Sequence, residues 1–179
     1  MKKSKIFWGY AVLALVIYAV VQLLISNGVI AFYYQNMFIA MCINIMLAVS
    51  LHVIIGVTGQ FSIGHAGFLA VGAYISAICT MKLGMPFITA ILVGAVVAAL
   101  AGLLVGIPSL RLKGDYLAIA TLGFAEIIRI VFLDIDYVGG AAGMTVTRQV
   151  TWTYAFLGAF ITILVIANFT KSRHGRACI

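Results

Sequence analysis

Long apolar stretches dominate the chain and predict helices rather than strands. A helix needs about 20 residues to cross the hydrocarbon layer of a membrane, and six of these stretches approach or reach that length. None has the short-range alternation of polar and apolar residues that is typical of membrane barrel strands. The expected spans are residues 6–25, 37–55, 66–81, 87–107, 115–133 and 152–169. The sequence therefore predicts an all-α polytopic membrane protein, with about six transmembrane helices in a single transmembrane domain over residues 1–179.

The composition agrees with this prediction and excludes several soluble classes. Of the 179 residues, 65% are hydrophobic and 8% are charged, where about 25% charged residues is usual in soluble domains. This excludes a disordered chain, a nucleic-acid-binding domain with a continuous basic face, and a small disulfide scaffold. The three cysteines, Cys42, Cys79 and Cys178, fit no metal or redox spacing, so we interpret them as structural.

The basic residues predict the orientation of the helices. Lysines precede the first span, but its apolar run is too long for a signal peptide and no small-residue cleavage site follows it, so we expect a retained helix. With the N-terminus in the cytoplasm, eight of the eleven basic residues are cytoplasmic, as is usual for Lys and Arg in short loops. These eight are Lys2, Lys3, Lys5, Arg111, Lys113, Lys171, Arg173 and Arg176. Lys82 and Arg148 fall outside, and Arg129 lies within a span.

The sequence of residues 56–72 is unlike that of a continuous membrane-spanning helix, because five glycines and several polar side chains lie between two apolar runs. One interpretation is a broken or re-entrant segment at residues 56–67 that lines a solute path. The alternative is a short cytoplasmic turn. Gln60, Ser62 and His65 are candidate pathway residues under the first interpretation, while His65 as a structural histidine is the competing hypothesis. A phosphate loop is excluded, since no Gly-Lys-Ser/Thr follows the glycines.

The span at residues 115–133 carries charges within an apolar run. Glu126 and Arg129 are three residues apart, so they can pair on one helix face. Charges at membrane depth mark solute pathways by default, which makes both residues pathway candidates. The alternative is a structural pair near the outer end of the helix. Asp115 follows Arg111 and Lys113 and suits the N-terminal end of a helix.

Small residues recur every four positions in the span at residues 87–107. This spacing places them on one stripe of the helix, where they permit close approach of another helix. The stripe consists of Ala90, Gly94, Ala98, Gly102 and Gly106. We interpret it as a packing surface.

Two blocks resemble the LivM-type permease subunits of bacterial branched-chain amino acid ABC transporters. The first runs from Thr58 to Ala66 with Gly72-Ala73-Tyr74 after it, and the second runs from Leu110 to Arg129. The residues that carry the resemblance most clearly are Gly59, Gly64, Gly72, Tyr74, Gly114, Asp115, Tyr116, Thr121, Gly123 and Phe124. One segment between the last two expected spans differs from the family. The family commonly has Thr-Gly-Gly-Pro there, whereas this chain has Val138-Gly139-Gly140-Ala141.

The resemblance implies a permease subunit in the bacterial inner membrane that forms half of a pathway for leucine, isoleucine and valine. Its implied partners are a second, LivH-like permease, two cytoplasmic ABC ATPases, an extracytoplasmic solute-binding protein and membrane lipid, without nucleic acid. ATP would be used by the partners, so we expect no cofactor or metal on this chain. Arg173, Gly175 and Arg176 resemble the start of the ATPase-coupling loop. Because the family continues beyond this loop, we expect the chain to be an N-terminal portion that does not support uptake alone.

Several other functions stay open at this point. The same family resemblance fits a permease for urea, short amides or other amino acids, and genomic neighbours that encode the binding protein would discriminate between these solutes. A non-transporting structural subunit or fragment is a second alternative. A membrane-embedded enzyme using His65 and Glu126 is disfavoured, because the sequence has no nucleophile motif or paired metal ligands.

The predicted orientation places Cys178 in the cytoplasm. In a variant with Cys42 and Cys79 replaced by serine, Cys178 should react with a membrane-impermeant thiol reagent only after the cells are opened, because the reagent cannot cross the bilayer. The measurement is the labelled fraction in intact and in opened cells. Equal labelling in intact cells would contradict the cytoplasmic assignment.

Overall fold

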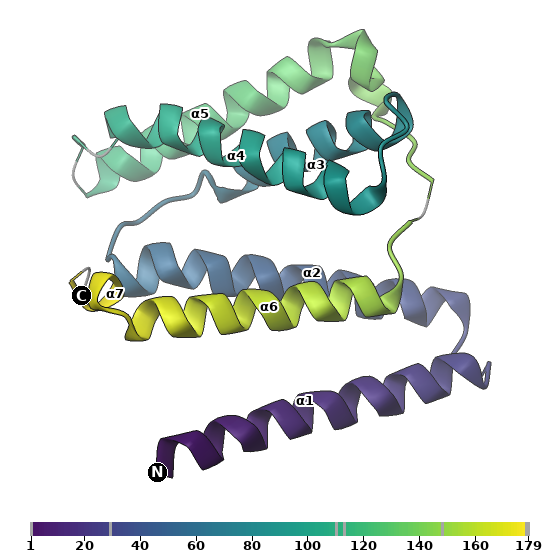
Figure 1. The fold of residues 1–179 in the computed structure, drawn as a ribbon. Helices are drawn as coiled ribbons and strands as arrows, with labels where there is room; N and C mark the ends of the chain where they lie inside the picture. Colours follow the sequence, from purple (N-terminus) through teal and green to yellow (C-terminus); the bar gives the residue numbers. More distant parts are fainter. Residues whose placement is uncertain (1, 29, 110, 113, 148, 178–179) are drawn as a thin grey trace. The chain divides into compact units, whose positions relative to one another are not determined.

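Helices make up the regular structure of the chain. The computed structural model describes residues 2–28, 30–109, 111–112, 114–147 and 149–177, and Cys178, Arg148 and Lys113 lie outside these ranges. The α-helices are α1 (Lys2–Ser26), α2 (Phe32–His52), α3 (His65–Met81), α4 (Phe87–Ser109), α5 (Asp115–Asp134), α6 (Trp152–Lys171) and α7 (Arg173–Ala177) (Figure 1). A π-helical segment, η1 (Val53–Val57), continues α2, and two 3₁₀ turns, η2 (Asp136–Val138) and η3 (Gly140–Ala142), follow α5. The prediction of an all-α fold is confirmed.

Five of the six expected apolar stretches lie within α1, α3, α4, α5 or α6, and the stretch at residues 37–55 covers most of α2 and the start of η1. Among the residues that the structure describes, four helical segments are long and apolar enough to cross a membrane, namely Phe32–Val57, Phe87–Ser109, Asp115–Asp134 and Trp152–Lys171. Two shorter apolar helices cover Ala14–Ser26 and His65–Met81. α2 begins at Phe32, five residues before the expected start at residue 37. α4 continues past Pro108, where the Ser109 hydroxyl donates to the carbonyls of Val105 and Gly106 at 2.7 and 3.1 Å.

The chain divides into two compact units. The first contains α1, α2 as far as Ser50, and α6, whereas the second runs from Leu51 to Gln149 and includes α7. All the candidate pathway residues and family-motif residues lie in the second unit. The single permease domain over residues 1–179 stays a prediction.

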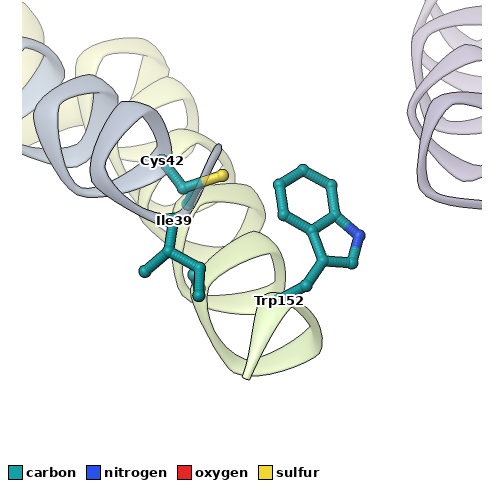
Figure 2. Close-up of a cluster of buried hydrophobic side chains, with 5 residues drawn as sticks. Ile39, Cys42 and Trp152 are labelled. Atoms are coloured by element: carbon teal, nitrogen blue, oxygen red, sulfur yellow. The ribbon is translucent and has the colours of Figure 1, made fainter. Parts of the chain in front are cut away.

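An apolar cluster holds the first unit together. Figure 2 shows Ile39 and Cys42 on α2 beside Trp152 at the start of α6. Ala155 and Ala159 complete the buried cluster, and the Phe38 ring meets the Trp152 ring edge to face at 5.9 Å between centroids. These contacts join helices through side chains of complementary size, as expected where lipid removes much of the hydrophobic drive for association.

The same unit has an open apolar cavity of about 410 Å³ between α1 and α6. Its lining includes Leu15, Tyr18, Phe156 and Phe160. The Tyr18 hydroxyl and the Thr153 hydroxyl lie 3.2 Å apart at its edge, so the polar groups there satisfy each other. The cavity has no charged lining residue, which makes it a poor site for a charged solute.

The second unit is built on an antiparallel hairpin of α3 and α4. The five residues 82–86 connect the two helices. A Cβ atom added at Gly94 would lie 2.7 Å from the Gly72 carbonyl oxygen and 3.1 Å from Ser76 Cβ, while one added at Gly72 would lie 3.5 Å from Ala98 Cβ. The hairpin therefore depends on small residues at the crossing.

The outward face of α4 is strongly apolar. Val96, Leu100 and Leu104 expose 60%, 55% and 77% of their surface. Such a continuous apolar face is unfavourable in water and suits contact with lipid tails. The hairpin thus presents its small residues to α3 and its large aliphatic residues to the surroundings.

Candidate functional site

The helix that begins at Phe32 ends in a break before α3. Over Val53–Val57 the backbone is π-helical, and the Thr58 amide donates to the Val53 carbonyl at 3.2 Å. The Thr58 hydroxyl and the Gln60 amide both donate to the Ile54 carbonyl, at 2.6 and 3.2 Å. These bonds satisfy carbonyls that a regular helix end would leave free. The break therefore pairs the Val53 and Ile54 carbonyls within the chain.

The expected broken segment at residues 56–67 is present but narrower. Non-helical backbone covers residues 58–64, because the chain is still π-helical at Val57 and α3 begins at His65. Gly59 adopts φ +66, a left-handed conformation that glycine reaches at little steric cost. The sequence singled out this glycine as part of a family motif, and the turn gives it a physical role.

The break leads directly into a close contact between α3 and α5. A Cβ atom added at Gly64 would lie 2.6 Å from the Thr121 carbonyl oxygen, and one added at Gly67 would lie 2.8 Å from the Ala125 Cα. Both distances are shorter than real Cβ contacts, so neither position accepts a side chain without backbone movement. Gly64 and Gly67 are buried. The two helices touch through backbone at these points.

Thr121 fixes this contact with its hydroxyl. The residue is 6% exposed, and its Oγ1 donates to the Ala118 carbonyl at 3.0 Å and accepts from the Ile63 amide at 3.2 Å. The hydroxyl thus joins the non-helical segment before α3 to the first half of α5. It satisfies a backbone donor that the helix break leaves without an intrahelical partner.

Aromatic stacking marks the other end of the α3–α5 contact. The Tyr74 and Phe132 rings stack with centroids 4.4 Å apart and an interplanar angle of 13°. Since Gly64 meets Thr121, Gly67 meets Ala125 and Tyr74 meets Phe132, α3 and α5 run parallel. The two sequence blocks that resemble one family therefore meet where Gly64 lies against Thr121.

The five pathway candidates fall in two places. Gln60 is exposed, and Ser62 and His65 are half-buried at the start of α3. Glu126 and Arg129 form the expected ion pair on α5, with Arg129 Nη1 donating to Glu126 Oε1 at 2.5 Å. Glu126 follows Ala125, the residue that meets Gly67, so the pair lies on a face of α5 next to the helix contact. Pairing is confirmed, whereas a role in a pathway stays a prediction.

The start of α5 has the features expected from its charges. Gly114 precedes the helix with φ +58, and Asp115 is exposed in the first turn, where a carboxylate is favourable beside the helix N-terminus. Tyr116 is 74% exposed, Gly123 is also exposed, and Phe124 is half-buried. These motif residues lie away from the closest α3–α5 contact, in contrast to Thr121.

The small-residue stripe of α4 packs only in its first part. Ala90 is fully buried, and Gly94 and Ala98 lie against α3. At Gly102 and Gly106, nothing among the described residues comes within 4 Å of an added Cβ atom. The hairpin contact therefore ends before these two glycines.

Three glycines with left-handed backbone shape the turn after α5. Gly139, Gly140 and Gly143 have φ +88, +52 and +75. Val138 is 2% exposed beneath the turn. The Lys82 ammonium donates to the Tyr137 carbonyl and lies 3.1 Å from the centroid of its ring, a cation–π contact that the sequence analysis did not anticipate. It ties the α3–α4 loop to this turn.

The remaining predicted residues lie on the short helix α7. Arg173 and Arg176 are exposed and Gly175 is buried. Their expected role at an ATPase stays a prediction. Among the residues that the structure describes, no group of three or more His, Cys, Asp or Glu side chains is placed to hold a metal ion.

Sequence reasoning missed Gly67 and Ala125, the pair that sets the closest helix approach. Gly67 is three residues after Gly64, and this spacing places both on one face of α3. Small residues at such spacing were a usable signal for helix contact, but they do not identify the partner helix.

Comparison with known proteins identifies the family. The family described as "Branched-chain amino acid transport system / permease component" matches residues 33–178. This chain belongs to that permease family. Its membership agrees with the multi-pass helical fold and assigns the chain to a family of membrane transport components rather than catalysts. No solved structure matches the chain.

Two curated proteins are similar to part of this permease-family chain. Both are described as "High-affinity branched-chain amino acid transport system permease protein LivM", one from Escherichia coli (strain K12) and one from Salmonella typhimurium (strain LT2). Each is 45% identical over 89 residues, which is 49% of this chain and 21% of the relative. The aligned region thus spans about a fifth of the length of these relatives.

The α3–α5 contact predicts different responses at two glycines of α3. Gly67→Ala should destabilise the protein by about 1–3 kcal/mol, because its Cβ meets the backbone of α5 and the helices must separate. Gly72→Ala is the matched control: it gains the same helix propensity, and its Cβ makes an ordinary contact at 3.5 Å. The measurement is the thermal midpoint of each purified variant in detergent. Equal midpoints for the two variants would contradict the close approach.

Proposed function

We propose that this chain forms part of the transmembrane pathway of an ABC importer for branched-chain amino acids. Membership of the permease family supports this proposal, as does the similarity to LivM proteins. The structural observation that carries it is the Glu126–Arg129 pair, which lies within an apolar helix yet is more than half exposed.

The depth of this pair argues for a wet or protein-covered environment. α5 ends at Asp134, so Glu126 lies eight residues and Arg129 five residues before its end. At about 1.5 Å per residue, Glu126 is roughly 12 Å along the helix from that end. A charge at such depth is costly in contact with lipid, by about 2.5–3.5 kcal/mol at the helix centre on the insertion scale. Exposure of the pair to a solute path removes much of this cost.

The partners in this proposal are a second permease, two ATPases and a solute-binding protein. The second permease would supply the other half of the pathway. The ATPases would act from the cytoplasmic side, where α7 supplies the exposed Arg173 and Arg176. Nucleotide-driven movement would expose the pathway alternately to each side, by favouring one conformation of the complex over the other.

The orientation in this proposal places the N-terminus and α7 in the bacterial cytoplasm. The eight-to-two distribution of loop lysines and arginines supports it. α5 then runs outward from Asp115, and the turn at Gly139 and Gly143 faces the side from which solute arrives.

The proposal predicts uptake that depends on this subunit. Cells that lack their own branched-chain permease but contain the other subunits should take up radiolabelled leucine when they also express the full-length subunit that carries this chain. Unlabelled isoleucine and valine should compete, because their side chains share the apolar branched character of leucine. The control is the same strain with the empty vector.

Competition by urea or acetamide, without competition by isoleucine and valine, would favour the short-amide alternative. Uptake that is equal in the vector control would contradict a transport role for this subunit.

A further inference from the structure

The exposed face of α5 combines opposite charges with apolar side chains. The Arg129 and Glu126 side chains are 63% and 52% exposed, whereas Leu117, Ala118 and Thr121 on another face are buried. Leu122 and Ile130 lie one turn before and one turn after Glu126, and they are 50% and 55% exposed. The charged pair is therefore flanked by aliphatic surface on both sides.

The pair retains capacity for further hydrogen bonds. Arg129 uses Nη1 for Glu126, and a guanidinium has five N–H donors. Glu126 uses Oε1, and a carboxylate accepts bonds at both oxygens. Within the described residues these are the bonds that the two side chains make. The outer edge of the pair can thus receive one anionic and one cationic group together.

Gly123 leaves room beside the pair. It lies three residues before Glu126 on the same side of the helix, and nothing among the described residues comes within 4 Å of an added Cβ atom there. A side chain at this position would stand over Glu126, because helical side chains three residues apart are neighbours. The glycine therefore leaves open space between Leu122 and the carboxylate.

We infer that Glu126, Arg129 and Gly123 form a subsite that binds the charged groups of a zwitterionic α-amino acid, with its side chain against Leu122 and Ile130. This inference rests on the proposed transport function and names the chemistry of recognition within it. Arg129 would receive the α-carboxylate in charge-assisted hydrogen bonds, and Glu126 would receive the α-ammonium.

The Glu126–Arg129 pair offers one partner to each charge of the zwitterion. A zwitterion that enters an apolar path loses water from both charges, and the pair replaces that water with one partner of each sign. An analogue without one charge leaves a protein charge without a solute partner. The subsite therefore distinguishes amino acids from amides and from fatty acids of similar shape.

The test is protection of a cysteine at position 122 from a neutral maleimide in opened membrane vesicles. The protein is the assembled transporter with the full-length subunit, in which the native cysteines are replaced and Leu122→Cys is introduced. Millimolar leucine should slow the labelling. Leucinamide, which lacks the carboxylate, and 4-methylpentanoate, which lacks the ammonium group, should each need about tenfold higher concentration for equal protection.

Substitutions at the pair separate binding from structure. Glu126→Gln or Arg129→Gln should raise the leucine concentration for half protection about tenfold. The double variant Glu126→Leu/Arg129→Leu removes both charges at once, so it leaves no single unpaired charge to disturb folding, and leucine should no longer be preferred over 4-methylpentanoate. Gly123→Leu should abolish protection, because its side chain would fill the open space beside Glu126. Its matched control is Gly102→Leu on α4, another helical glycine with open space around it, which should leave protection unchanged.

ATP-dependent leucine uptake by the same transporter, measured without the pair substitutions, separates the two proposals. Uptake without any leucine protection would overturn the subsite and leave the transport function standing. Equal protection by leucine and 4-methylpentanoate, or protection unchanged in both glutamine variants, would also overturn the subsite. Absence of uptake would instead contradict the transport function.

Discussion

The close approach of α3 and α5 is the contact on which the second unit depends. Between two helices in lipid, association rests on packing and on interhelical hydrogen bonds, because the surroundings are as apolar as the side chains. Gly64 and Gly67 allow backbone contact, and the Thr121 hydroxyl adds a bond to the Ile63 amide. Both effects act at the point where the polypeptide leaves the break after α2. The break and the helix contact are therefore one structural feature rather than two.

This contact also decides which way α5 faces. With Thr121 and Ala125 turned toward α3, the neighbouring Glu126 turns away from it. The ion pair consequently lies on an exposed face, where it neither stabilises the α3–α5 contact nor is covered by it. Exposed ion pairs contribute little to stability in water, and in lipid they are costly. The fold thus holds a charged pair in a position that its own packing does not require.

The sequence predicted α1 to α6 well because each of these helices contains a long apolar run with glycine, proline or polar residues near its ends. It also predicted the Glu126–Arg129 pair, since a spacing of three brings two side chains together on any helix. The rotation of α5 was not predicted, because the sequence does not show which other helix packs against which face of it. For the same reason, the stripe on α4 does not show which helix meets each of its residues: Gly94 and Ala98 lie against α3, and no described residue comes within 4 Å of a Cβ atom added at Gly102 or Gly106. Small residues permit close contact, but the partner helix decides where it occurs.

The most direct measurement is chemical cross-linking between α3 and α5 in the membrane. In a subunit whose native cysteines are replaced, Tyr74→Cys and Phe132→Cys should be joined by a short bifunctional thiol reagent, because the two native rings are stacked at 4.4 Å. Tyr74→Cys with Tyr116→Cys is the control, since residue 116 is sixteen positions, or about 24 Å along the helix, before Phe132. The account predicts that mass spectrometry detects a joined peptide for the first pair and not for the second. Cross-linking of the second pair in preference to the first would contradict the parallel packing of α3 on α5.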